Sequence, residues 1–168
     1  APHTALAGHH PARPEARVAT TCGCGAQAGP QLEHIASILP LETVHAWDVA
    51  PERARHFAGQ ATRALGVEVV PAGKLRGATR QSDIIVTCTT AREPFLGLGD
   101  VAAGAFIAAV GADHPEKREI EPELLAGALL YADSIEQCAV MGELHHAIAE
   151  EWMARDDVAG ELADLVTG

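Results

Sequence analysis

Apolar runs alternate with segments of helical periodicity along this chain, which is the pattern of a parallel α/β sheet. Five short apolar runs predict strands, and a sixth run further along predicts another. The predicted strands cover residues 17–22, 43–47, 67–70, 83–87, 105–110 and 129–132. The alternation therefore predicts strands joined by helical crossovers.

The segments between the strands carry helical signals. In the first, apolar residues recur at i, i+3, i+4 and i+7, which gives a helix one buried face. These residues are Leu32, Ile35, Ala36 and Leu39. Pro51 suits the first turn of a second helix. This second helix is expected to bury Ala54, Phe57, Ala58, Ala61 and Leu65. A short helical stretch is expected near Leu75.

Two more helices are expected in the last part of the chain. Ser134 and Gln137 form a capping-box pattern, which predicts a long helix from there through about Arg155. The last dozen residues, up to Gly168, also look helical.

Right-handed crossovers on this pattern predict a doubly wound Rossmann fold with strand order 3-2-1-4-5-6. The length of 168 residues suits one domain, so residues 1–168 are interpreted as a single nucleotide-binding domain. The chain reverses direction between strands 1 and 4. A ligand is therefore expected in the crevice at the carboxyl ends of these strands.

A GxGxxA run follows the first strand and leads into the first helix. Gly23 permits the tight turn, Gly25 lets a pyrophosphate approach the backbone, and Ala28 keeps helix and strand close. Ala26 and Gln27 complete the run. Asp48 follows Ala28 by twenty residues, at the end of the second strand, where a carboxylate can take both hydroxyls of an adenosine ribose. The pattern predicts a dinucleotide site.

Asp48 also bears on the choice of dinucleotide. A 2′-phosphate beside it would bring like charges together, and neither Val49 nor Ala50 supplies an Arg to offset this. NAD(H) is therefore favoured over NADP(H).

Strands 4 and 5 deliver further polar residues to the same edge of the sheet. Thr87 is interpreted as a β-branched residue with a purely structural role in the strand. Thr89 is either a residue of the same kind or a cofactor contact. Strand 5 ends on Val110 and Gly111, which are candidate cofactor contacts. Asp113 and Lys117 follow. Asp113 is a candidate proton donor or acceptor, although Asp also begins many turns, and Lys117 is either a ligand or a solvated cation.

Charge argues against nucleic acid as a partner, because the formal net charge is −11. No apolar segment approaches the roughly 18 residues of a membrane span, and residues 1–7 do not resemble a signal peptide. The four cysteines are expected to be reduced structural thiols in a cytoplasmic protein with no metal site. The pairs His9-His10 and His145-His146 are expected to be solvated.

These residues resemble the ornithine cyclodeaminase and mu-crystallin family, which includes alanine dehydrogenases and cyclic-imine reductases. The likeness rests on the glycine run, Trp47-Asp48, DIIVTCTT, GELHHAI and, above all, VGADHPEKREI. It extends from Arg13-Pro14 to the ELADLVTG end.

The resemblance implies an enzyme that acts, with NAD, at the α-amino or imino carbon of a small amino acid. It implies that Asp113 is the acid/base residue and that Ala26, Gln27, Asp48, Thr89 and Lys117 contact NAD. Mu-crystallin-like members, which bind nucleotide and a small ligand, lack the acid at the position of Asp113. A non-catalytic binding protein of that kind is the alternative.

The resemblance also implies a longer, homodimeric protein, because family members are about twice this length. Their first half forms a dimerising domain with the Arg and Lys that hold the substrate carboxylate. The 168-residue chain alone is therefore expected to bind nucleotide and to be inactive.

Overall fold

The computed structural model describes residues 13–167, and His9-His10 lie outside them. The chain divides into two compact units. Unit 1 holds the residues up to Thr89 together with Asp100–Ala108, and unit 2 holds Thr90–Gly99 and the residues from Ala109 on.

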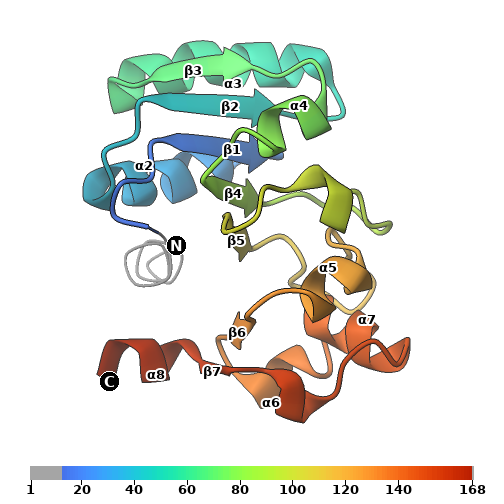
Figure 1. Cartoon of the computed structure of the whole chain (residues 1–168). Helices are drawn as coiled ribbons and strands as arrows, with labels where there is room; N and C mark the ends of the chain where they lie inside the picture. The colour runs from blue at the N-terminus through green and yellow to red at the C-terminus, as the bar shows by residue number, and fades with distance from the viewer. Residues whose placement is uncertain (1–12, 168) are drawn as a thin grey trace. The chain divides into compact units, whose positions relative to one another are not determined.

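A five-stranded sheet forms the centre of unit 1, and Figure 1 shows its strands side by side in the order β3-β2-β1-β4-β5. They are β1 (Val18–Cys22), β2 (Thr43–Trp47), β3 (Glu68–Pro71), β4 (Ile84–Thr87) and β5 (Phe106–Ala109). Cys22, the last residue of β1, lies opposite Trp47 in β2 and Thr87 in β4. The predicted α/β fold and the order of the first five strands are confirmed, and the three strand ends meet at one edge.

Three helices of unit 1 connect these strands: α2 (Ala28–Ile38), α3 (Pro51–Leu65) and α4 (Leu75–Thr79). The predicted core residues Leu32 and Ile35 are fully buried. In α3, three predicted core residues are at most 7% exposed: Ala54, Ala58 and Ala61. Three other expected core residues, Ala36, Phe57 and Leu65, are only half-buried. Small residues let α3 approach β2 and β3 closely, whereas Phe57 and Leu65 border a shallow hollow next to Gly29 and Glu33 of α2.

Unit 2 contains a second, two-stranded sheet of β6 (Tyr131–Ala132) and β7 (Gly160–Glu161), which run parallel. The expectation that the sixth strand would extend the large sheet is therefore wrong. A two-residue strand carries no pattern that identifies its partner. The helices of unit 2 are α5 (Pro122–Ala126), α6 (Ile135–Cys138), α7 (Glu143–Ala149) and α8 (Leu162–Thr167), and the chain also has the 3₁₀ turns η1 (Leu98–Asp100) and η2 (Arg155–Asp157).

The long helix predicted from Ser134 to Arg155 is interrupted. Its start is correct, because the Ser134 hydroxyl accepts the backbone N–H of Gln137 at 3.4 Å. However, α6 ends at Cys138, and α7 begins only after Gly142, whose φ is +89°. A left-handed backbone angle cannot continue a right-handed helix. The apolar periodicity continues across this break and therefore conceals it.

The cysteines Cys22, Cys24, Cys88 and Cys138 are free thiols, as predicted. Within residues 13–167, no three His, Cys, Asp or Glu side chains gather in a way that could hold a metal ion. No helix in that same range is long and apolar enough to cross a membrane.

Candidate functional site

Gly23 shapes the turn between β1 and α2. Its φ is +98°, and a Cβ at this position would lie 2.8 Å from the carbonyl oxygen of Cys88 and 2.9 Å from Cγ2 of Thr89. Its N–H donates to the carbonyl of Trp47 at 2.8 Å. Both the backbone angle and the space therefore require glycine. Thr89 lies directly beside the turn, whereas Thr87 is fully buried, as expected of a residue with a structural role in the strand.

The next residues leave the start of α2 open. Gly25, Ala26 and Gln27 are exposed, and a Cβ on Gly25 would meet nothing within 4 Å. Ala28 is fully buried where the helix begins, so helix and sheet pack closely. No side chain of the described residues caps α2, and its first turn carries no acidic residue. Backbone N–H groups at such a helix start can bind an anion.

Asp48 joins the end of β2 to this turn. Its residue exposure is only 8%, and its Oδ2 accepts the N–H of Cys24 at 3.0 Å while Oδ1 accepts the N–H of Ala50 at 2.9 Å. Burial, together with the Asp48 charge, raises the pKa of the Cys24 thiol to about 12, so this cysteine is not a nucleophile at neutral pH.

An arginine near Asp48 was not foreseen from the sequence. The Nη1 of Arg53 lies 3.5 Å from Oδ2 of Asp48. Arg53 lies five residues after Asp48, beyond Val49 and Ala50, and reaches back to the carboxylate from the first turn of α3. Val49, which follows Asp48 in the sequence, is 84% exposed and so presents an apolar side chain to solvent.

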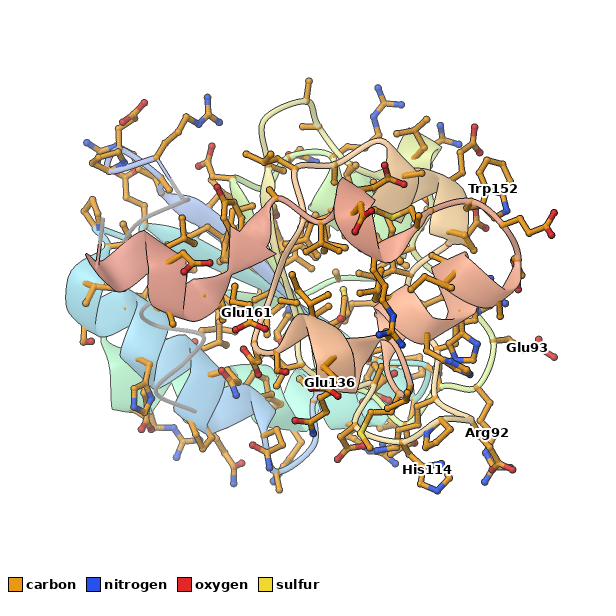
Figure 2. All side chains as sticks on the ribbon, turned by 90° about the horizontal axis from the view of Figure 1, so that it is seen from below. Arg92, Glu93, His114, Glu136, Trp152 and Glu161 are labelled. Atoms are coloured by element: carbon orange, nitrogen blue, oxygen red, sulfur yellow. The ribbon has the colours of Figure 1, made fainter. Side chains whose placement is uncertain are left out.

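Asp113 and Lys117 lie in an open pocket of unit 2 with a volume of about 360 Å³. The pocket is lined by Thr90, Arg92, Asp113, His114, Glu116 and Lys117. Lys117 Nζ is 2.5 Å from Oδ1 of Asp113, and this hydrogen bond lowers the pKa of the Asp113 carboxyl below its usual range. Figure 2 shows Arg92 and His114 close together at the edge of the unit, with their side chains pointing outward.

Two buried carboxylates in unit 2 were missed in the sequence. Glu119 is fully buried, and its Oε2 accepts the N–H of Gly111 at 3.0 Å. Glu143 is 8% exposed and accepts the N–H groups of Glu119 and Ile120. Glu119 lies in VGADHPEKREI and Glu143 in GELHHAI, two of the stretches that carry the family resemblance, and this was the available signal. Val110, predicted as a cofactor contact, is half-buried.

The histidine pair His145-His146 is half-buried rather than solvated. His146 Nε2 lies 3.0 Å from the carbonyl oxygen of Lys117, and His145 Nδ1 lies 3.4 Å from that of Ala139. A carbonyl only accepts, so His146 carries its proton on Nε2 and donates to the backbone of Lys117.

We expect the stability of the chain to depend on the titration of Glu143. Burial raises its pKa to about 7, and nearby Glu119 adds to this, although two backbone N–H bonds and Arg118 lower it. The native state then favours the protonated carboxyl, so this stabilisation is complete below about pH 4.5 and is lost as pH rises through 7. Between pH 5 and 8 the unfolding free energy should fall by about 2–3 kcal/mol more in the parent chain than in Glu143→Gln.

Urea unfolding of both proteins at several pH values measures this difference. Exposed carboxylates titrate alike in both proteins and cancel. A parent chain that becomes more stable than the Gln variant as pH rises would show that Glu143 is held ionised.

Comparison with known sequences identifies close relatives of the chain. The family model of the Ornithine cyclodeaminase/mu-crystallin family matches residues 1–168. The iminosuccinate reductase of Paracoccus denitrificans is 34% identical over 91% of the chain and 47% of its own length. The alanine dehydrogenase of Archaeoglobus fulgidus is 30% identical over 97% of the chain and 50% of its own length. The chain thus spans about half the length of these relatives.

A solved structure is similar over nearly the whole chain. It is the Thermococcus litoralis Delta(1)-pyrroline-2-carboxylate reductase in complex with NADH and L-proline, with a TM-score of 0.95 and 30% identity. The match covers 99% of this chain and 53% of the reductase.

Proposed function

Since the chain belongs to the ornithine cyclodeaminase/mu-crystallin family, we propose that it is the NAD(H)-binding part of an enzyme acting on a small amino acid. The reaction takes place at the α-amino or imino carbon of the substrate. Three relatives are named for reactions at such a carbon: alanine dehydrogenase, iminosuccinate reductase and Delta(1)-pyrroline-2-carboxylate reductase. Net dehydrogenation, imine reduction and cyclodeamination all fit the proposal.

The cofactor would be held in unit 1 by the turn after β1. The pyrophosphate would accept hydrogen bonds from the backbone N–H groups of Gly25, Ala26 and Gln27, since the start of α2 is exposed and uncapped. Gly23 and Ala28 shape this turn. Bound there, the nicotinamide supplies hydride transfer.

Three more residues of unit 1 complete this part of the proposed cofactor site. Asp48 would accept the ribose hydroxyls, because each of its oxygens keeps a lone pair beyond the backbone bonds described above. Val49 would pack against the adenine, and Thr89 would lie beside the phosphates. Three further cofactor contacts remain predictions, those of Val110, Gly111 and Lys117.

The observation that carries the proposal of an enzyme is the position of Asp113. Its carboxylate is 73% exposed in the pocket and is bonded to Lys117. Lys117 keeps it ionised, so in the oxidative direction Asp113 starts as a base that can take a proton from a substrate ammonium group. In the reductive direction the protonated carboxyl returns it. Proton transfer of this kind would distinguish the enzyme from the alternative, a protein that binds nucleotide and a small ligand without catalysis.

We expect NADH to bind more tightly than NADPH, and Asp48→Ser to weaken NADH by about 1.5–3 kcal/mol, or roughly 10–150-fold. Fluorescence titration of the full-length protein measures both. Arg53→Ala is the matched control, because it removes the cation next to Asp48 and leaves the carboxylate in place. Equal or tighter NADPH binding by the parent protein would contradict the choice of NAD, and a selective loss of NADPH in Arg53→Ala would assign a 2′-phosphate to that arginine.

The complete protein is further proposed to be a cytoplasmic homodimer. A dimeric archaeal alanine dehydrogenase with bound NAD is among the similar structures, at 30% identity and a TM-score of 0.93.

A further inference from the structure

The loop that carries Asp113 is built against a buried carboxylate. Gly111 precedes Asp113 by two residues, and its N–H donates to Oε2 of Glu119 at 3.0 Å. A Cβ on Gly111 would lie 2.5 Å from both Cδ and Oε2 of Glu119. Glycine at this position leaves the space that the Glu119 carboxyl group occupies.

A backbone hydrogen bond within the loop couples Asp113 to Gly111. The N–H of Asp113 donates to the carbonyl of Gly111 at 3.0 Å. A shift of Gly111 would therefore move the Asp113 backbone with it. Positional errors of about 1 Å at a catalytic group can cost roughly 10²-fold in rate.

A second buried carboxylate holds the first in place. Glu143, the first residue of α7, accepts the N–H of Glu119 at 2.8 Å with Oε1 and the N–H of Ile120 at 3.2 Å with Oε2. The preceding Gly142 comes so close to the loop that a Cβ on it would lie 3.1 Å from the carbonyl oxygen of Ala112. The segments around residues 119 and 143 thus both lie against the loop.

A carboxylate is a costly way to fill this space. Burying it sacrifices hydration, and a well-packed apolar side chain often gives equal or better stability. An apolar side chain cannot accept the N–H of Gly111, and so it cannot fix the backbone of the loop at that residue. The contacts of Glu119 and Glu143 therefore serve the geometry of the loop.

We propose that Glu119 is a positioning residue for Asp113, and that Glu143 holds Glu119 in the orientation this requires. The inference rests on the proposed function, in which Asp113 moves the proton. Glu119 acts through Asp113 and does not itself touch substrate.

The test compares turnover in the full-length protein with and without Asp113. We expect Glu119→Ala to lower kcat by about 10–100-fold with little change in the Kd of NADH. Glu119→Gln keeps an oxygen to accept the N–H of Gly111 and should stay within about fivefold of the parent. Glu121→Gln, an exposed neighbour, is the matched control and should be unchanged. If the Ala variant does not fold, Glu119→Asp withdraws the carboxyl group from Gly111 while keeping an acidic side chain at this position.

The decisive comparison places the same changes in an Asp113→Asn background. A residue that acts through Asp113 loses its effect there, so Glu119→Ala or Glu119→Asp should change kcat less than about twofold. An equal loss in both backgrounds, or a parallel loss of NADH binding, would make Glu119 merely structural and overturn the proposal. An unchanged kcat in Glu119→Ala would overturn it too. A fully active Asp113→Asn protein would instead refute the proposed function.

Discussion

Replacing Asp113 by Asn in the full-length protein should lower turnover by about 10²–10⁴-fold. The amide keeps the shape of the side chain, but it cannot take a proton from the substrate amine. Because the side chain is 73% exposed and its described ion-pair partner is Lys117, the fold loses little when the charge is removed. The Kd of NADH should change little, since the proposed cofactor contacts in unit 1 are untouched. Steady-state rates and an NADH titration measure the two effects.

The competing interpretation makes Asp113 a residue that only shapes the turn. In that case Asp113→Asn would lower the melting temperature and leave the specific activity intact. Asp133→Asn, another exposed aspartate of unit 2, is the matched control for loss of one negative charge. A stable and fully active Asp113→Asn protein would rule out the acid/base role.

Gly23→Ala should lower the unfolding free energy by about 3 kcal/mol or more, because φ +98° is unfavourable for alanine and the new methyl would press on the Cys88 carbonyl. Gly25→Ala should behave in the opposite manner. Its methyl meets nothing within 4 Å in the protein, so stability should hold. NADH affinity should fall by at least tenfold, because we propose that the pyrophosphate occupies that space. Denaturant unfolding and NADH titration of both variants separate a glycine needed by the fold from one needed by the ligand.

Gly59→Ala provides the control for this pair. Gly59 lies inside α3, where alanine favours the helix by about 1 kcal/mol, and the nearest atom to a new Cβ would be Nη2 of Arg63 at 4.0 Å. It should raise stability slightly and leave NADH binding unchanged. Unaltered NADH affinity in Gly25→Ala would contradict the placement of the pyrophosphate.

The parts of the fold that follow from local pattern were predictable. The bounds of β2 were predicted without error, because a short apolar run ends there at Asp48 and Pro51 opens the next helix. Strand order followed from the handedness of crossovers. The glycine run was recognisable because each position has a local steric reason.

The features that escaped prediction depend on contacts between distant residues. Glu119 and Glu143 are 24 positions apart and each looks like an ordinary surface glutamate. Glu119 occupies the space that Gly111 leaves, and Glu143 accepts the backbone N–H of Glu119. In the same way, the helix breaks before α7 at Gly142, which has a left-handed backbone angle and lies close to the carbonyl oxygen of Ala112. The apolar periodicity of the sequence does not reveal this break.

The hydrogen bond from the N–H of Cys24 to Asp48 fixes the glycine turn through contacts within the protein itself. The conformational entropy of this loop is then lost when the protein folds, and binding does not have to lose it again. An incoming dinucleotide would meet a preformed surface, and its association rate would not be limited by rearrangement of the loop. The same carboxylate would thus act twice, in organising the turn and in recognising the ribose.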